Sequence, residues 1–232
     1  MGRHRAGVDE HFRVLFVCTG NVCRSPFAEI LTRHLLRARL GPAAARFVVA
    51  SAGVQGVAGA GMHPDSRAEL APWGLHGAAS GTFVARRLDV SMVDAADLVL
   101  GAGARHRRSV LECSPAGLGT TFAVREFARL AAAVDPAVLP ADPVERAHAL
   151  VDHARHGRGL APPAGPDADR VPDPIGGPRQ AHHAAAVLLA EALETVVSVI
   201  TPGHLQTAVL SRPAVRRWAG EPQLRDETER ER

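Results

Sequence analysis

Two spacings of apolar residues alternate along residues 13–200. Short apolar runs are typical of buried strands, and residues such as Phe27, Leu31 and Leu35 recur at helical spacing. Strands are predicted at 13–17, 47–50, 98–100 and 121–124, and helices at 26–40, 64–71, 104–112, 125–134 and 179–200. Strands that alternate with helices predict an α/β fold with a parallel sheet covered on both faces.

The composition changes outside this pattern. Residues 135–170 are rich in Pro, Ala, Asp and His, and we interpret them as an insertion within a single domain, 13–200. Residues 1–12 are predicted to be a flexible extension, and residues 201–232, which end in a mixed-charge run, a polar tail. Because Glu191 and Glu194 interrupt the most apolar segment, we expect an amphipathic helix there rather than membrane insertion.

Charge and cysteine content narrow the functional classes. The net charge of +3 suits anionic ligands, but aromatic residues make up only 4% and no clustered basic patch is visible, so no nucleic-acid partner is expected. Three cysteines, two of them in one loop, do not form a disulfide framework. The N-terminus lacks the apolar region of a signal peptide, and we expect a cytoplasmic location.

The stretch V-C-T-G-N-V-C-R-S-P, residues 17–26, lies between the first predicted strand and the first predicted helix. Anionic ligands bind at this position in α/β sheets. Gly20 and Asn21 are residue types that accept positive φ, so the amides of residues 19–24 can curl into an anion nest. The planar guanidinium of Arg24 can hold two phosphate oxygens at once.

This environment favours the thiolate form of Cys18, which is a nucleophile towards phosphorus. The hydroxyl of Ser25 is placed either to cap the helix or to donate to the sulfur. A cysteine six residues before an arginine is weak evidence alone, and the alternative is a buried cysteine with an incidental surface arginine. The accompanying glycine, asparagine and serine favour the catalytic interpretation.

The motif resembles the signature V-C-x-G-N-[IV]-C-R-S-P-x-A-E of the low-molecular-weight protein tyrosine phosphatases, and residues 17–29 match it throughout. The resemblance continues at Ser51-Ala52-Gly53, Pro64-Asp65-Ser66-Arg67-Ala68, Ala85-Arg86, Ala96-Asp97-Leu98-Val99-Leu100, Arg125-Glu126-Phe127 and Asp173-Pro174. It implies a four-stranded parallel sheet of flavodoxin-like order in three α/β/α layers, with the phosphate loop after the first strand. It also implies hydrolysis of phosphotyrosine through a phosphocysteine intermediate, without a metal or other cofactor.

The resemblance implies a general acid from an Asp-Pro loop, and Asp173 matches. A phenolate leaving group needs a proton, and one carboxyl group can later activate water. Asp135-Pro136 and Asp142-Pro143 are rival Asp-Pro pairs that are more simply turns. We favour Asp173 because it alone directly precedes the last helix.

Supporting roles are also implied by the resemblance. Thr19 to Ser25 form the phosphate-binding loop, and Asn21 pairs with Ser51 to hold its shape. Cys23 is either a resolving cysteine for oxidised Cys18 or a packing residue.

Val57 and Ile175 are the expected walls of the substrate pocket, with Ile175 at a position where the family usually has an aromatic residue. The expected partner is a tyrosine-phosphorylated protein, for example a bacterial tyrosine kinase. The sequence does not name the substrate or predict the oligomeric state.

Other interpretations remain open. Phosphoarginine hydrolysis goes with threonine where Val22 stands, which argues against it. Thioredoxin-coupled arsenate reduction needs two further cysteines, and only Cys113 remains. A phosphoprotein-binding module without turnover is the alternative from a non-enzyme class.

Two groups of histidines suggest metal ligands but have simpler interpretations. His148, Asp152 and His156 would align on one face of a helix, and we interpret this as a solvated face. His182 and His183 are expected to begin a surface helix that needs no ligand.

Overall fold

The computed structural model describes residues 10–160, 162–165 and 167–201. Four strands, β1 (Phe12–Cys18), β2 (Phe47–Gly53), β3 (Leu98–Gly101) and β4 (Thr121–Ala123), form a sheet in the order β2-β1-β3-β4. Every neighbouring pair is parallel. The predicted four-stranded parallel sheet is therefore confirmed, and the strand carboxyl ends meet at one edge.

Within the described residues, the helices include the five that the apolar periodicity predicts, with shifts of a few residues, and three that it does not predict, at 78–81, 90–95 and 143–157. They are α1 (Arg24–Leu40), α2 (Pro64–Ala68), α3 (Ala78–Gly81), α4 (Val90–Ala95), α5 (Ala104–Cys113), α6 (Val124–Ala132), α7 (Pro143–Gly157) and α8 (Arg179–Ile200). Short 3₁₀ turns cover Gly41–Arg46, Ala71–Trp73, Pro115–Gly119 and Pro136–Val138. The predicted helix 64–71 ends early, because Pro72 cannot donate the hydrogen bond that would continue it.

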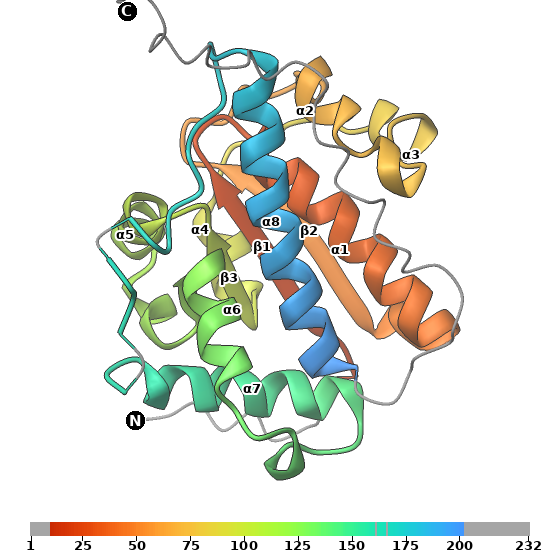
Figure 1. Ribbon diagram of the computed structural model, residues 1–232. Helices are drawn as coiled ribbons and strands as arrows, with labels where there is room; N and C mark the ends of the chain where they lie inside the picture. Colours follow the sequence, from red (N-terminus) through yellow and green to blue (C-terminus); the bar gives the residue numbers. More distant parts are fainter. Residues whose placement is uncertain (1–9, 161, 166, 202–232) are drawn as a thin grey trace, which may run out of the picture.

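Side chains of β1 alternate between two apolar cores. Val14 and Phe16 pack on the face covered by α1, α6, α7 and α8, whereas Leu15 and Val17 pack on the opposite face with Val110 of α5. Figure 1 shows α8 and α1 running side by side in front of the sheet. These layers give the three-layer α/β/α arrangement of the flavodoxin type.

Helix α8 is, among the described residues, the one helix long and apolar enough by length and composition to cross a membrane. It packs along α1 and α6, and its Leu189, Leu193 and Val197 are buried in the core. Half of its most apolar window is buried inside the domain. Core packing therefore accounts for its apolar residues.

The segment 135–170 contains a packed helix. Val144, Ala147 and Leu150 of α7 are fully buried, and α7 contacts β1, α6 and α8. In Figure 1 it runs across the lower ends of α6 and α8. An alanine-rich composition therefore conceals an apolar stripe that belongs to the domain core.

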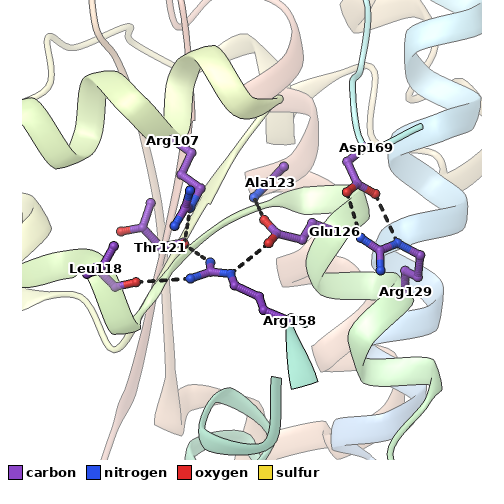
Figure 2. Close-up of polar contacts among 8 residues, drawn as sticks. All are labelled: Arg107, Leu118, Thr121, Ala123, Glu126, Arg129, Arg158 and Asp169. Atoms are coloured by element: carbon purple, nitrogen blue, oxygen red, sulfur yellow. Dashed lines mark hydrogen bonds and ion pairs between the residues drawn. The ribbon is translucent and has the colours of Figure 1, made fainter. Parts of the chain in front are cut away.

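Ion pairs fasten the rest of this segment (Figure 2). Arg158, just after α7, donates to Glu126 Oε1 at 2.8 Å and to the carbonyl of Thr121, and its guanidinium lies 4.0 Å from the Phe122 ring centre. Asp169 accepts from Arg129 at 2.8 Å. Arg158 is thus bound to β4 and α6, and Asp169 is bound to α6.

The domain extends slightly beyond the predicted limits. Phe12, assigned from sequence to the N-terminal extension, begins β1 and is fully buried, and Thr201, assigned to the tail, is buried after α8. Residues 1–9 and most of the predicted tail, 202–232, lie outside the described residues.

Candidate active site

The loop 18–25 connects β1 to α1 at the carboxyl edge of the sheet. Asn21 has φ of 57°, as predicted, but the same expectation for Gly20 is wrong, because Gly20 is not among the positive-φ residues. The loop instead presses against Gly53, where an added Cβ would lie 2.6 Å from the carbonyl oxygen of Thr19. The close approach to β2 therefore helps define the loop's shape.

The side chain of Asn21 holds the loop from inside. Its Nδ2 donates to Ser25 Oγ and to Ser51 Oγ, each at 2.8 Å, and its Oδ1 accepts from the Arg86 amide at 2.9 Å. Ser51 Oγ in turn donates to Glu29 Oε2 at 2.6 Å. The structure thus brings the predicted pair Asn21 and Ser51 together in a fully buried network.

Cys18 lies at the base of the loop with 2% of its surface exposed. Its Sγ is 3.0 Å from Ser25 Oγ. Ser25 Oγ accepts a hydrogen bond from Asn21 Nδ2, so its own hydroxyl proton can be donated to the sulfur or to the more distant Ala52 carbonyl at 3.4 Å. Of the two roles predicted for Ser25, the geometry supports donation to sulfur, since α1 has Cys23 at its N-cap and no side-chain cap there.

Arg24 connects the loop to the segment before α8. Its Nη2 contacts Asp173 Oδ2 at 2.5 Å and Thr19 Oγ1 at 3.3 Å, and its Nη1 donates to the Val171 carbonyl at 3.2 Å. Its Nε is buried without a partner among the described residues. A buried guanidinium with one unused donor is a ready binding group for an oxyanion.

The rival aspartates lie elsewhere and cap helices. Asp135 accepts from the Ala137 amide, and Asp142 accepts from the Val144 amide and pairs with Arg46 at 2.5 Å. That arginine's hydrogen bond lowers the pKa of Asp142. Of the three candidate acids, only Asp173 reaches Arg24.

His106, on α5, was not identified from sequence. Its Nε2 lies 3.1 Å from Thr19 Oγ1, and it is buried. Burial, reinforced by Arg24 and Arg105, lowers its pKa to about 4. A neutral imidazole therefore supports the loop at physiological pH. It lies 88 positions after Cys18 and outside the motif, so no local signal marks it.

Cys23 and His182 line a small cavity together with Arg24. Burial raises the pKa of the Cys23 thiol to about 11, so this cysteine is a neutral thiol at pH 7. The three cysteines are free, and whether Cys23 acts as a resolving cysteine remains a prediction. The expectation of a surface position is wrong for His182, which is 2% exposed. The buried apolar face of α8 already begins in the first turn of the helix, where His182 lies.

The predicted pocket walls lie at the surface beside the loop. The Val57 amide donates to the Gly20 carbonyl at 3.1 Å, and the Ile175 amide donates to Asp173 Oδ1 at 3.3 Å. Both side chains are more than half exposed, and Val22 is partly buried. Val57 thus lies beside the phosphate loop and Ile175 beside the acid, each with an exposed aliphatic side chain.

The array His148, Asp152 and His156 lies on α7 and is not part of the phosphate-loop site. Asp152 and His156 are exposed as predicted, whereas His148 is partly buried and packs edge-on against Phe12 at 4.9 Å. Within the described part of the chain the three do not form a metal-ligating cluster.

Comparison with known proteins gives one consistent answer. A sequence model of the family described as low molecular weight phosphotyrosine protein phosphatase matches residues 13–154, a range that ends within α7, before Asp173. The chain is similar to a low molecular weight protein-tyrosine-phosphatase of Streptomyces coelicolor, with 37% identity over 134 residues, 56% of this chain and 74% of the relative. It is 30% identical over 141 residues to the low molecular weight protein-tyrosine-phosphatase Etp of Escherichia coli K12, covering 61% and 88% of the two chains.

Solved structures agree on the fold. The arginine phosphatase YwlE of Geobacillus stearothermophilus superimposes with a TM-score of 0.55 at 24% identity, over 81% of this chain and 91% of that one. At this identity the likeness bears on the fold alone.

Proposed function

Since the chain belongs to the low molecular weight phosphotyrosine protein phosphatase family, we propose that it hydrolyses phosphotyrosine in proteins through a phosphocysteine intermediate on Cys18. The observation that carries this proposal is the convergence of Cys18, Arg24 and Asp173 at one end of the sheet, although Asp173 lies 149 positions after Arg24. Family membership supports the reaction class, and this geometry supports the roles proposed below.

Substrate binding begins at Arg24. Its contact with Asp173 occupies the guanidinium, and an incoming phosphate dianion takes over Nη2 and satisfies the unpartnered Nε. The displaced Asp173 carboxyl group is then free to face the leaving-group oxygen. Binding therefore prepares the acid as well as the phosphate.

In the first step Cys18 Sγ attacks phosphorus and the bond to the phenolic oxygen breaks. The electron pair goes to that oxygen, which takes a proton from Asp173. Charge on the equatorial oxygens is stabilised by the loop amides and Arg24. The products are a phosphocysteine and a dephosphorylated tyrosine residue in the substrate protein.

In the second step water attacks the phosphocysteine while Asp173, now a carboxylate, takes its proton. The P–S bond breaks and the electron pair returns to sulfur. The hydroxyl of Ser25, 3.0 Å from Cys18 Sγ, stabilises the departing thiolate. Inorganic phosphate is released, and the charge of the site supplies what a catalytic metal would otherwise provide.

The test is turnover of para-nitrophenyl phosphate in the presence of a chelator. Wild type is expected to be active, and Cys18→Ser is expected to lose activity because its hydroxyl is not ionised at neutral pH. Acid-quenched Asp173→Asn protein incubated with substrate should carry a phosphoryl group on Cys18, detected by peptide mass spectrometry. Turnover by Cys18→Ser would contradict the proposal, and phosphate binding without turnover by wild type would favour the binding-module alternative.

Phosphoarginine is the competing substrate, because an arginine phosphatase shares the fold. Val22 at the loop rim offers no hydrogen bond to a guanidinium-linked phosphate, whereas threonine would add one with little change in shape. We expect phosphotyrosine peptides to be hydrolysed about tenfold better than phosphoarginine peptides, a gap of about 1.4 kcal/mol, and Val22→Thr to narrow it. The kcat/KM values on matched peptides decide, and a wild-type preference for phosphoarginine would overturn the assignment.

A cytoplasmic protein substrate, such as a tyrosine kinase, completes the proposal. The free cysteines Cys18, Cys23 and Cys113 support a reducing compartment. The exposed aliphatic side chains Val57 and Ile175 support recognition of surrounding protein surface rather than of the ring alone. Fractionation of cells would contradict the location if the protein were found outside the cytoplasm.

A further inference from the structure

Behind the phosphate loop, three potential metal ligands from distant parts of the chain come together. Cys23 belongs to the loop, His63 directly precedes α2, and His182 lies in the first turn of α8. One ligand atom of each lies within 4.8 Å of those of the other two. This is the one such cluster of three or more groups among the described residues, and the catalytic steps above do not use it.

The histidine nitrogens are unequally satisfied. His182 Nδ1 lies 2.8 Å from Ser66 Oγ, whereas its Nε2 is buried and has no partner within the described part of the chain. His63 Nδ1 accepts from the Asp65 amide at 3.3 Å. His182 can donate its Nδ1–H to Ser66 Oγ, which leaves Nε2 to coordinate a metal in the usual way. His63 accepts at Nδ1 and therefore carries its proton on Nε2, so it would coordinate a metal through Nδ1 after giving up the bond from the Asp65 amide.

We propose that Cys23, His63 and His182 form a binding site for a divalent metal ion of the zinc type, which regulates the phosphate loop. One sulfur and two imidazole nitrogens favour zinc over magnesium or calcium. When the ion binds, the Cys23 thiol releases its proton to solvent and the sulfur forms the metal bond. A cavity of about 10 Å³, lined in part by Cys23, Ser66 and His182, has room for about one water as a fourth ligand.

Binding requires the cluster to contract and the imidazole rings to turn, because the rings of His63 and His182 are stacked, with centres 4.4 Å apart and planes at 21°. Ligand atoms of a tetrahedral zinc site lie about 3.3–3.6 Å apart, about 1.2–1.5 Å closer than the 4.8 Å limit here. Cys23 precedes Arg24 directly and occupies the N-cap position of α1, and Pro174 of the acid loop lines the same cavity. A metal that draws Cys23 towards α8 therefore shifts the residue on which phosphate binding depends.

The binding test uses the full chain carrying Cys18→Ser and Cys113→Ser, so that Cys23 is the only cysteine. Titration with Co²⁺ should produce a thiolate-to-cobalt charge-transfer band together with the visible bands of four-coordinate cobalt, and Zn²⁺ should abolish both. Failure of the charge-transfer band to form would overturn the site. The readout does not depend on catalysis.

Variants assign the ligands. Cys23→Ala should remove the charge-transfer band, and His63→Gln or His182→Gln should weaken metal binding at least tenfold. His183→Gln is the matched control, because His183 is exposed and paired with Glu69, and its affinity should be unchanged. Because His182 is buried, circular dichroism is used to check that the His182→Gln variant folds. If it does not fold, the test rests on the partly exposed His63, and an unchanged metal affinity in His63→Gln would overturn the proposal.

The regulatory part rests on the proposed function and is tested with Cys18 in place. Zinc should slow para-nitrophenyl phosphate hydrolysis by wild type, and His63→Gln should need at least tenfold more zinc for the same effect. Equal sensitivity in the two proteins would place the inhibition at Cys18 and overturn the regulatory part. A wild type without turnover would contradict the proposed function, whereas the cobalt spectrum would still report on the site.

Discussion

The phosphate loop and the acid loop meet at Arg24 but are held in opposite ways. Asn21, Ser25 and Ser51 of the phosphate-loop network are buried, with hydrogen bonds of 2.8 Å. Asp173 in the acid loop is 38% exposed, and its side chain bonds only to Arg24 and to a neighbouring amide among the contacts described. The nucleophile is thus fixed before substrate arrives, whereas the acid can exchange partners during the cycle.

The largest effect should come from removing the acid. Asp173→Asn should lower kcat on phenolic phosphates by about 10²- to 10⁴-fold and affect good leaving groups least, because only the proton donor is lost. Its free energy of unfolding should fall by about 1 kcal/mol, because the buried guanidinium of Arg24 loses its charged partner, although the 38% exposure of Asp173 weakens the effect. Steady-state kinetics and urea unfolding measure the two quantities.

The matched controls are Asp135→Asn and Asp142→Asn, whose side chains cap helices away from Arg24. If either lowers kcat as much as Asp173→Asn does, the assignment of the acid loop is wrong.

The next effect concerns the pH dependence of stability through His106. Its pKa is about 4 in the folded protein, against 6.5 normally, so between these values the unfolded chain binds more protons. The stabilisation is present above pH 6.5 and is lost as the pH falls towards 4, by up to about 3 kcal/mol. His106→Gln should flatten this part of the curve in chemical unfolding measured at several pH values.

His183→Gln serves as the comparison, because this exposed histidine is not part of the loop's support. A wild-type stability that is constant between pH 6.5 and 4 would contradict the burial-driven shift in the pKa of His106.

The smallest of the three effects tests whether the buried hydrogen-bond network holds the phosphate loop. Asn21→Ala removes three hydrogen bonds and leaves Ser25 and Ser51 without their donor, so unfolding should become easier by about 2 kcal/mol. Ser51→Ala, which removes fewer bonds, should cost less. An Asn21→Ala protein as stable as wild type would show that the loop does not depend on this network.

Sequence predicts the contiguous parts of the site well and the assembled parts poorly. Cys18 and Arg24 lie in one motif, and Asp173 was separated from its rivals by its position before α8. His106 could not be predicted, because α5 reaches Thr19 only through the tertiary fold. Among the three Asp-Pro pairs, Asp173 was preferred from its order along the chain. Its 2.5 Å contact with Arg24 is visible only in the folded structure.

Two errors had signals that a closer look at periodicity would detect. His182 lies three and four positions before the buried Ala185 and Ala186, on the stripe that continues to Leu189. Likewise, α7 is hidden in a proline- and alanine-rich segment, although its buried residues follow helical spacing. Alanine is only weakly apolar, so it adds little to the apolar pattern in a sequence. Its small side chain nevertheless packs closely against a neighbouring helix.

The contact between Asp173 and Arg24 also bears on how a turnover ends. A carboxylate tethered beside the guanidinium competes with inorganic phosphate at a high effective concentration, because both seek the same donors. Product that leaves is therefore replaced at once by a group of the protein itself. The enzyme carries its own competitor against product inhibition, and the inhibition constant for phosphate, compared between wild type and Asp173→Asn, measures how strongly it acts.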